Sequence, residues 1–169
     1  MDFIELTLQE YEHEMRATRN VLECVPDEHW GWKPHPKSMS LGMLASHIAE
    51  SQRWAEDVMT KDELVLDFAS FRPYEAKNRM EMLAKFDRLA LLAAKSMAGV
   101  SNERLAAQWR LKSPDGQVLL QKSRLAILRD FVINHTIHHR GQLTVYLRLK
   151  DVPLPQVYGP TADDTAMKG

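Results

Sequence analysis

The spacing of apolar residues is the feature that most restricts the fold of this chain, because they recur every three or four positions in four long stretches. These stretches cover residues 4–25, 40–58, 73–99 and 121–150. Such spacing places apolar side chains along one side of a helix, and each helix must bury that side against a neighbour. The sequence therefore predicts an all-α protein built as a four-helix bundle.

Residues that start or end helices lie at the boundaries of these stretches. Pro26 ends the first helix, and Ser40 is a favourable N-cap for the second. Pro73 suits the first turn of the third helix, which we expect to begin near it. The turn at residues 114–116 lies between alternating apolar residues and indicates a possible short hairpin between the third and fourth helices. We expect one domain over residues 1–169.

Composition excludes several classes of protein. Lys and Arg number 22 against 23 Asp and Glu, for a net charge of −1, and no basic run could follow a phosphate backbone, so we expect no nucleic-acid partner. The first ten residues carry acids rather than the basic segment of a signal peptide, and no apolar run approaches the ~20 residues of a membrane span. We therefore expect a cytoplasmic protein without membrane contact. Cys24 is the single cysteine, which excludes an internal disulfide and a four-cysteine zinc site.

Two histidines four residues apart lie in the apolar stripe of the last predicted helix. His135 and His139 are neighbours on the helix surface, so both rings can reach one ion at the ~2.0–2.1 Å of a zinc–nitrogen bond. His47 lies on the inward side of the second predicted helix. Bundles build metal sites from inward side chains of facing helices. We therefore predict one divalent metal ion held by His47, His135 and His139, with one coordination position left open.

The alternative to a metal site is a set of ordinary core or surface histidines. A single histidine is more often a hydrogen-bonded core or surface residue than a ligand. Two neutral imidazoles side by side in an apolar stripe, however, need partners for four ring nitrogens, and a metal ion supplies these more simply than separate hydrogen bonds. His138 is the rival ligand, but it points toward the side of the stripe. The pair together with His47 therefore favours a metal site.

Two further residues are candidates for a catalytic role. Glu50 follows His47 by one helical turn and is a candidate base or outer carboxylate, although a solvated helix acid is the alternative. Gln142 lies on the same side as the histidine pair and is a candidate hydrogen-bond partner of a ligand or substrate, with helix packing as the alternative. Trp30 and Trp32, in the proline-rich loop, either line the mouth of a pocket or pack on the surface.

The last predicted helix is apolar on two sides. Ile133, Ile137 and Thr144 lie roughly opposite the histidines. A helix that touches two neighbours inside one bundle would explain this, and so would a two-fold contact through the same helix. We expect a homodimer.

Two segments resemble known sequences. NHTIHHRGQLTVYLRLKDVPLPQVYGP, residues 134–160, is similar to the closing signature of the DinB-like (damage-inducible) superfamily of metal-binding four-helix bundles. WGWKPHPKSMSLGMLASHIAES, residues 30–51, resembles the loop and second helix of that family, with its single ligand histidine. The resemblance implies three histidine ligands, which fall here on His47, His135 and His139. It also implies zinc or nickel as the metal, with iron or manganese as alternatives, and frequent dimers.

The resemblance implies an activity as well. The family includes metal-dependent enzymes that transfer groups through small thiols, and other members are described as metal-dependent hydrolases. We therefore expect a thiol S-transferase that acts on small electrophilic compounds through a metal-bound thiolate. The alternatives are a hydrolase that uses metal-bound hydroxide, and a non-enzymatic metal-binding stress or interaction protein. The resemblance identifies neither the thiol nor the second substrate.

Overall fold

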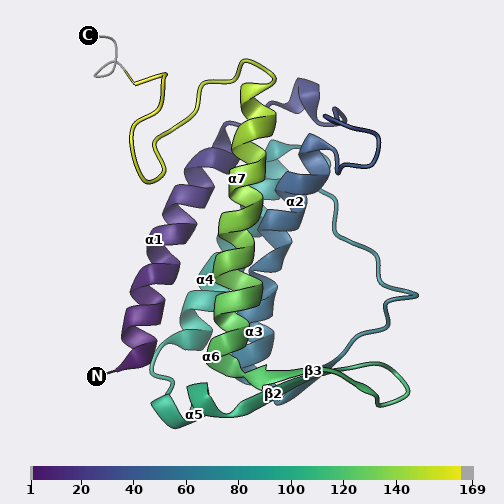
Figure 1. The fold of residues 1–169 in the computed structure, drawn as a ribbon, viewed down its shortest axis with the longest axis vertical. Coiled ribbons are helices and arrows are strands. Elements are labelled where there is room, and N and C mark those ends of the chain that lie inside the picture. Colours follow the sequence, from purple (N-terminus) through teal and green to yellow (C-terminus); the bar gives the residue numbers. More distant parts are fainter. Residues whose placement is uncertain (1, 165–169) are drawn as a thin grey trace.

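Four helical runs form a bundle in the computed structural model, which describes residues 2–164 (Figure 1). The first run packs against the third and the fourth, and the second run packs against the same two. This arrangement buries the apolar stripes in one core. In chain order the helices are α1 (Phe3–Glu23), α2 (Leu41–Ser51) with α3 (Arg53–Thr60), α4 (Arg79–Met97), the short α5 (Asn102–Ala106), and α6 (Arg124–Ile127) continued by a π-helical turn (Leu128–Ile133) into α7 (Asn134–Arg148).

The protein is not purely all-α, and in this respect the fold prediction is wrong. A three-stranded sheet with the order β1-β2-β3 lies at the end of the bundle where α3 ends and α6 begins (Figure 1). The predicted hairpin is confirmed as β2 (Gln108–Lys112) paired antiparallel with β3 (Val118–Ser123). The strand that the sequence did not indicate is β1 (Glu63–Val65), which pairs parallel with β2. Three residues are too few to show a strand period, and the partner strand is distant in sequence.

The third helix begins later than predicted. Asn78, not a residue near Pro73, is the N-cap of α4, and its side chain accepts a hydrogen bond from the backbone N–H of Glu81 (2.9 Å). Residues 66–78 therefore form a long connector between β1 and α4, which runs along the outside of the bundle beside α2 and α3 (Figure 1).

The second and fourth helical runs are interrupted. The second breaks at Gln52, between α2 and α3. The fourth begins at Arg124, with Ser123 as its N-cap, because residues 118–123 belong to β3. It then passes through the π-helical turn directly before α7. Such turns insert an extra residue per turn and are frequent at functional sites.

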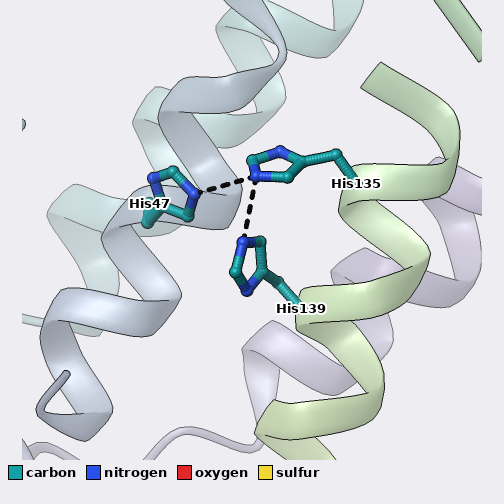
Figure 2. Close-up of side chains that lie close together, drawn as sticks. All are labelled: His47, His135 and His139. Atoms are coloured by element: carbon teal, nitrogen blue, oxygen red, sulfur yellow. Dashed lines mark hydrogen bonds between the residues drawn. The ribbon is translucent and has the colours of Figure 1, made fainter. Parts of the chain in front are cut away.

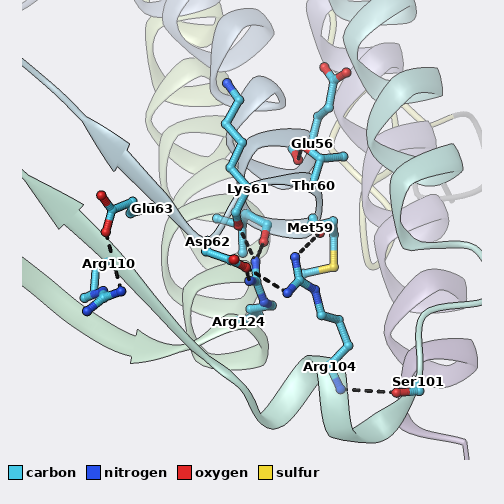
Figure 3. Close-up of polar contacts among 11 residues, drawn as sticks. Glu56, Met59, Thr60, Lys61, Asp62, Glu63, Ser101, Arg104, Arg110 and Arg124 are labelled. Atoms are coloured by element: carbon cyan, nitrogen blue, oxygen red, sulfur yellow. Dashed lines mark hydrogen bonds and ion pairs between the residues drawn. The ribbon is translucent and has the colours of Figure 1, made fainter.

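Buried Arg124 joins the bundle to the sheet (Figure 3). Its guanidinium donates hydrogen bonds to the carbonyls of Val58 and Lys61 at the end of α3, and to the carboxylate of Asp62. Arg104 in α5 donates to the same carboxylate at 2.8 Å. Hydrogen bonds that involve a charged group are stronger than those between neutral groups. The bonds of Arg124 and Arg104 fix the start of β1, and hence of the connector, against the fourth helical run.

The second apolar side of α7 is partly used inside the chain. Ile133 is buried, whereas Ile137 and Thr144 are half-buried. Helix α7 has both α1 and α2 as neighbours, as a helix with two apolar sides requires. The homodimer stays a prediction. So does the single domain, whose outermost residues, 1 and 165–169, lie outside the described part of the chain. Within residues 2–164, every helix is too short or too polar to cross a lipid bilayer.

Candidate metal centre

Three imidazole rings from two helices converge on one another. His47 projects from α2, and His135 and His139 project from α7, one helical turn apart (Figure 2). The Nε2 atom of His135 lies 3.3 Å from Nε2 of His47 and 3.0 Å from Nε2 of His139. One nitrogen from each ring lies within 4.8 Å of the other two. The structure thus brings together the three residues that the sequence selected.

The donor set fits a divalent ion. An ion ~2.0–2.1 Å from each nitrogen places neighbouring nitrogens roughly 3.0 Å apart at right angles and roughly 3.4 Å apart at tetrahedral angles. The two observed separations lie at these values. A neutral imidazole has one N–H and one nitrogen with a free lone pair. Where such lone pairs point toward a common point, a bound cation can accept them. The three histidines could therefore hold a metal ion.

Burial keeps these rings neutral. Burial first, and then the charges that His139, His47 and His138 would carry, lower the pKa of His135 to about 4. Burial also lowers the pKa of His47 and of His139. Neutral imidazole is the form that binds metals, so the site is prepared for a ligand role over a wider pH range than an exposed histidine.

The second ring nitrogens show how each ring is oriented. Nδ1 of His139 lies 2.7 Å from Oε1 of Gln142, so a proton on Nδ1 is held by the amide oxygen and Nε2 keeps its lone pair. Gln142 is thus placed as a hydrogen-bond partner of a ligand residue. Nδ1 of His135 is buried and has no hydrogen-bond partner among the described residues. His138 is exposed, and its ring packs only beside that of His139, 4.8 Å away, outside the group of three.

Glu50 lies one turn beyond His47 but has structural partners. Its Oε2 accepts a hydrogen bond from the backbone N–H of Tyr74 at 3.0 Å, and its Oε1 lies 3.9 Å from a guanidinium nitrogen of Arg53. Ser46, one turn before Glu50 on α2, accepts a hydrogen bond from the backbone N–H of Ala76. Glu50 and Ser46 thereby hold the connector of residues 66–78 against α2. Among the described residues, Glu50 makes no hydrogen bond to the histidine nitrogens, although its charge acts on His47, where it opposes the lowering of that ring's pKa by burial.

A cavity of about 430 Å³ adjoins the metal centre, and His47 and His135 form part of its wall. One side is the face of α2 and α3 that carries Met43, Trp54 and Glu50, and the other is Phe131, one turn before His135. The connector lines the outer side of the cavity. The residues of β1 and the connector that line the cavity are Leu64, Leu66, Phe68, Phe71, Pro73, Tyr74 and Glu75.

The two tryptophans of the proline-rich loop pack against the bundle and do not line this cavity, whereas Met39 at the end of the same loop does. Trp30 lies over Gly42, where an added Cβ would stand 2.2 Å from the indole, so only glycine fits there. Its indole N–H donates to the carbonyl of Ala76 (3.0 Å), which ties this loop to the connector. Trp32 packs edge-on against Tyr146 of α7. The two tryptophans thus anchor the loop.

Sequence reasoning missed the cavity and its wall. Met43 and Trp54 share the stripe of His47, at positions four and seven residues away, and Phe131 shares the stripe of His135. Their spacing is also that of ordinary core residues, because a stripe does not reveal where two helices diverge. A weak signal was present in Phe68 and Phe71, two aromatic residues in a segment without helical period.

Comparison with known proteins agrees with this architecture. The sequence profile of the DinB family matches residues 1–168. Two proteins of Bacillus subtilis (strain 168) are similar: uncharacterized protein YrdA is 26% identical over 164 residues, covering 96% of this chain and 92% of its own length. Uncharacterized protein YjoA is 26% identical over 132 residues, covering 78% of this chain and 80% of its own.

Crystal structures of related proteins share the fold. A DinB-like protein from Bacillus cereus ATCC 10987 superposes with a TM-score of 0.72 at 21% identity, covering 91% of this chain and 97% of that one. The DinB-like protein YjoA from Bacillus subtilis superposes with a TM-score of 0.70 at 20% identity, covering 90% and 97%. Since the family profile extends over nearly the whole sequence, this chain belongs to the DinB family.

Proposed function

We propose that the protein is a metal-dependent thiol S-transferase acting on small electrophilic compounds. The observation that carries the proposal is that two members of the three-histidine group, His47 and His135, line an apolar cavity. A divalent ion held by His47, His135 and His139 would supply Lewis acidity that lowers the pKa of a thiol toward neutrality. The metal expected is zinc or nickel, with iron or manganese as alternatives.

The residues of the chain contribute orientation and exclusion of water. Gln142 holds the His139 ring so that Nε2 faces the other two histidines. Trp54 and Phe131 pack 6.0 Å apart and, with the connector, shield the cavity beside His135 from solvent. In the transfer, the sulfur attacks an electrophilic carbon and a carbon–sulfur bond forms. The leaving group departs with the electron pair of the broken bond, and the thiol proton passes to solvent.

Hydrolysis is the second candidate, and one observation favours it. Glu50 lines the same cavity as His47 and His135, as a general base for water would. One oxygen of this carboxylate is occupied by the N–H of Tyr74, however, and the other faces Arg53. The contacts of Glu50 therefore support a role as an anchor for the connector better than a role as a base.

We also propose that the protein forms a homodimer, which light scattering after gel filtration would test.

The test is a rate measurement with 1-chloro-2,4-dinitrobenzene and a panel of small thiols. Protein loaded with zinc or nickel should form the thioether faster than metal-free protein with at least one thiol. His135→Ala should abolish that gain, whereas the matched control His138→Ala should retain it. Equal rates for loaded and metal-free protein with every thiol would reject the transferase. Metal-dependent release of chloride without thiol would favour the hydrolase instead.

A further inference from the structure

The cavity beside the histidines has a composition that restricts what it can bind. Its wall is built mainly from methionine, leucine and aromatic side chains. Pockets of this kind gain affinity from apolar contact, and a few polar groups fix the orientation of the ligand. Methionine adapts to irregular shapes, and Met39 and Met43 both lie in this wall.

The charged groups of the wall are the second restriction. They are Glu50, Glu75 and Arg53. The guanidinium of Arg53 is neutralised locally, because it lies 3.9 Å from Glu50 and 3.6 Å from Asp57. The two acidic residues therefore outweigh the cation. An anionic ligand would be desolvated in an apolar space without a cation to receive it, which is costly.

The third restriction is the direction of approach. His47 and His135 are the wall residues nearest the metal centre, and Phe131 lies one turn before His135 on the same helical run. Two aromatic rings, Trp54 and Phe131, are inclined by 30° at a centroid separation of 6.0 Å. A planar ring that packs against them would lie in the same cavity that His47 and His135 line.

We infer that the cavity binds a neutral, apolar ring compound and discriminates against anionic ones, so that it holds the electrophile rather than a thiol that carries carboxylates. The inference rests on the proposed function only for the reactivity of this compound. Binding itself depends on Met43, Trp54, Phe131 and the connector, and needs no metal ion.

Two dyes that share one ring system give a direct test on the metal-free protein. N-phenyl-1-naphthylamine is neutral, and 8-anilinonaphthalene-1-sulfonate is the same skeleton with a negative charge. The neutral dye should bind saturably with one site per chain and gain fluorescence, and the sulfonate should bind at least tenfold more weakly. Equal affinities, or tighter binding of the sulfonate, would overturn the inference.

Substitutions that add a positive charge to the cavity wall test whether the dyes bind there. Exposed positions are chosen so that the variants still fold. Met39 is 38% exposed and Phe68 is 63% exposed, so both tolerate a polar side chain, and both line the cavity. Met39→Lys and Phe68→Lys should each shift the preference toward the sulfonate at least tenfold. The matched control is Met80→Lys on α4, which is 77% exposed and outside the cavity wall. An unchanged preference in both cavity variants, or the same shift in the control, would place the dye elsewhere and contradict the inference.

The outcomes for binding and for activity are separable. Neutral dye bound selectively to a protein without thiol-dependent turnover would remove the proposed function and leave the cavity assignment intact. Thiol-dependent turnover that the neutral dye does not inhibit would remove the cavity assignment and leave the transferase intact.

Discussion

His139 and Arg140 are consecutive residues of α7, and they enter two polar clusters of opposite kind. Arg140 is 2% exposed and faces α1, where it donates to the carbonyl of Glu14 and the hydroxyl of Thr18, both at 3.1 Å. It also pairs with the Glu14 carboxylate at 2.8 Å and donates to the hydroxyl of Tyr158, which itself donates to Glu14. Each of these charged groups is matched by another group of the chain.

The histidine cluster on the other side of α7 is not matched in this way. Its Nε2 nitrogens pair with one another rather than with an opposite charge, and Nδ1 of His135 has no partner among the described residues. A fully paired buried network stabilises a fold, whereas an unpaired buried group calls for an explanation, such as a ligand from outside the chain. The comparison separates a cluster that holds the tertiary structure from one arranged for a ligand.

The largest expected effect is the loss of stability when Arg140 is removed from its cluster with Glu14, Thr18 and Tyr158. Arg140→Met should lower the free energy of unfolding by about 3–5 kcal/mol, because it leaves the Glu14 carboxylate buried without its cation. Urea unfolding of the metal-free protein measures this loss. The matched control is Arg148→Met, which removes an exposed pair with Asp163 and should cost about 0–1 kcal/mol. Similar losses in the two variants would show that the buried network does not stabilise the fold.

The second effect is on metal affinity. His139→Ala should weaken zinc binding by roughly 100-fold or more, because it removes one of three ligands, while the urea midpoint of the metal-free protein should change little. His138→Ala, next to it on the exposed side, should change the zinc Kd by only a few-fold. Competition with a chromophoric chelator measures both. A larger loss in His138→Ala would mean that the wrong pair on α7 had been identified.

The third effect concerns the group that orients His139. Gln142→Leu removes the acceptor of the Nδ1 proton and should weaken zinc binding about tenfold, the lower end for outer partners of ligand histidines. Gln142→Glu keeps an acceptor oxygen and should retain or improve affinity. The same chelator competition applies. If both variants weakened binding equally, the hydrogen bond to His139 would have no part in it.

The fourth effect is the pH dependence of the metal-free fold. Burial lowers the pKa of His135 to about 4, below the ordinary value of about 6.5, so the unfolded chain binds more protons between these values. Stability should therefore be fully present above pH 6.5 and should fall as the pH decreases toward 4. Urea midpoints from pH 7.5 to 4.5 measure the decrease, which should be smaller in His135→Ala. An equal decrease in that variant would assign the acid sensitivity to other groups.

Local patterns were sufficient for the helices and for the histidine group. The spacing of four residues put His135 and His139 on one side of a helix, and the inward position of His47 did not depend on exact helix ends. The start of α4 was also readable, since Asn78 followed by Glu81 is an N-cap with an acid three residues later, yet Pro73 also suits a first turn. Because the prediction starts the helix near Pro73, it assigns to helix the second half of the connector, which lines the cavity.

Long-range pairings could not be predicted in the same way. The parallel contact of β1 with β2 and the ion pair of Arg140 with Glu14 join segments that no period relates. The connector that forms one wall of the cavity is held against α2 by Glu50 and Ser46, whose partners are backbone groups of residues 74 and 76. Backbone partners leave no trace in side-chain identity, so this anchoring is visible only in three dimensions.

X-ray absorption by protein loaded with one equivalent of zinc tests the central claim most directly. The account predicts three imidazole nitrogens at ~2.0–2.1 Å with one further light ligand that exchanges when a small thiol is added, which brings in sulfur at ~2.3 Å. A spectrum with fewer than three imidazoles would contradict it, because the three rings on α2 and α7 would then not share an ion.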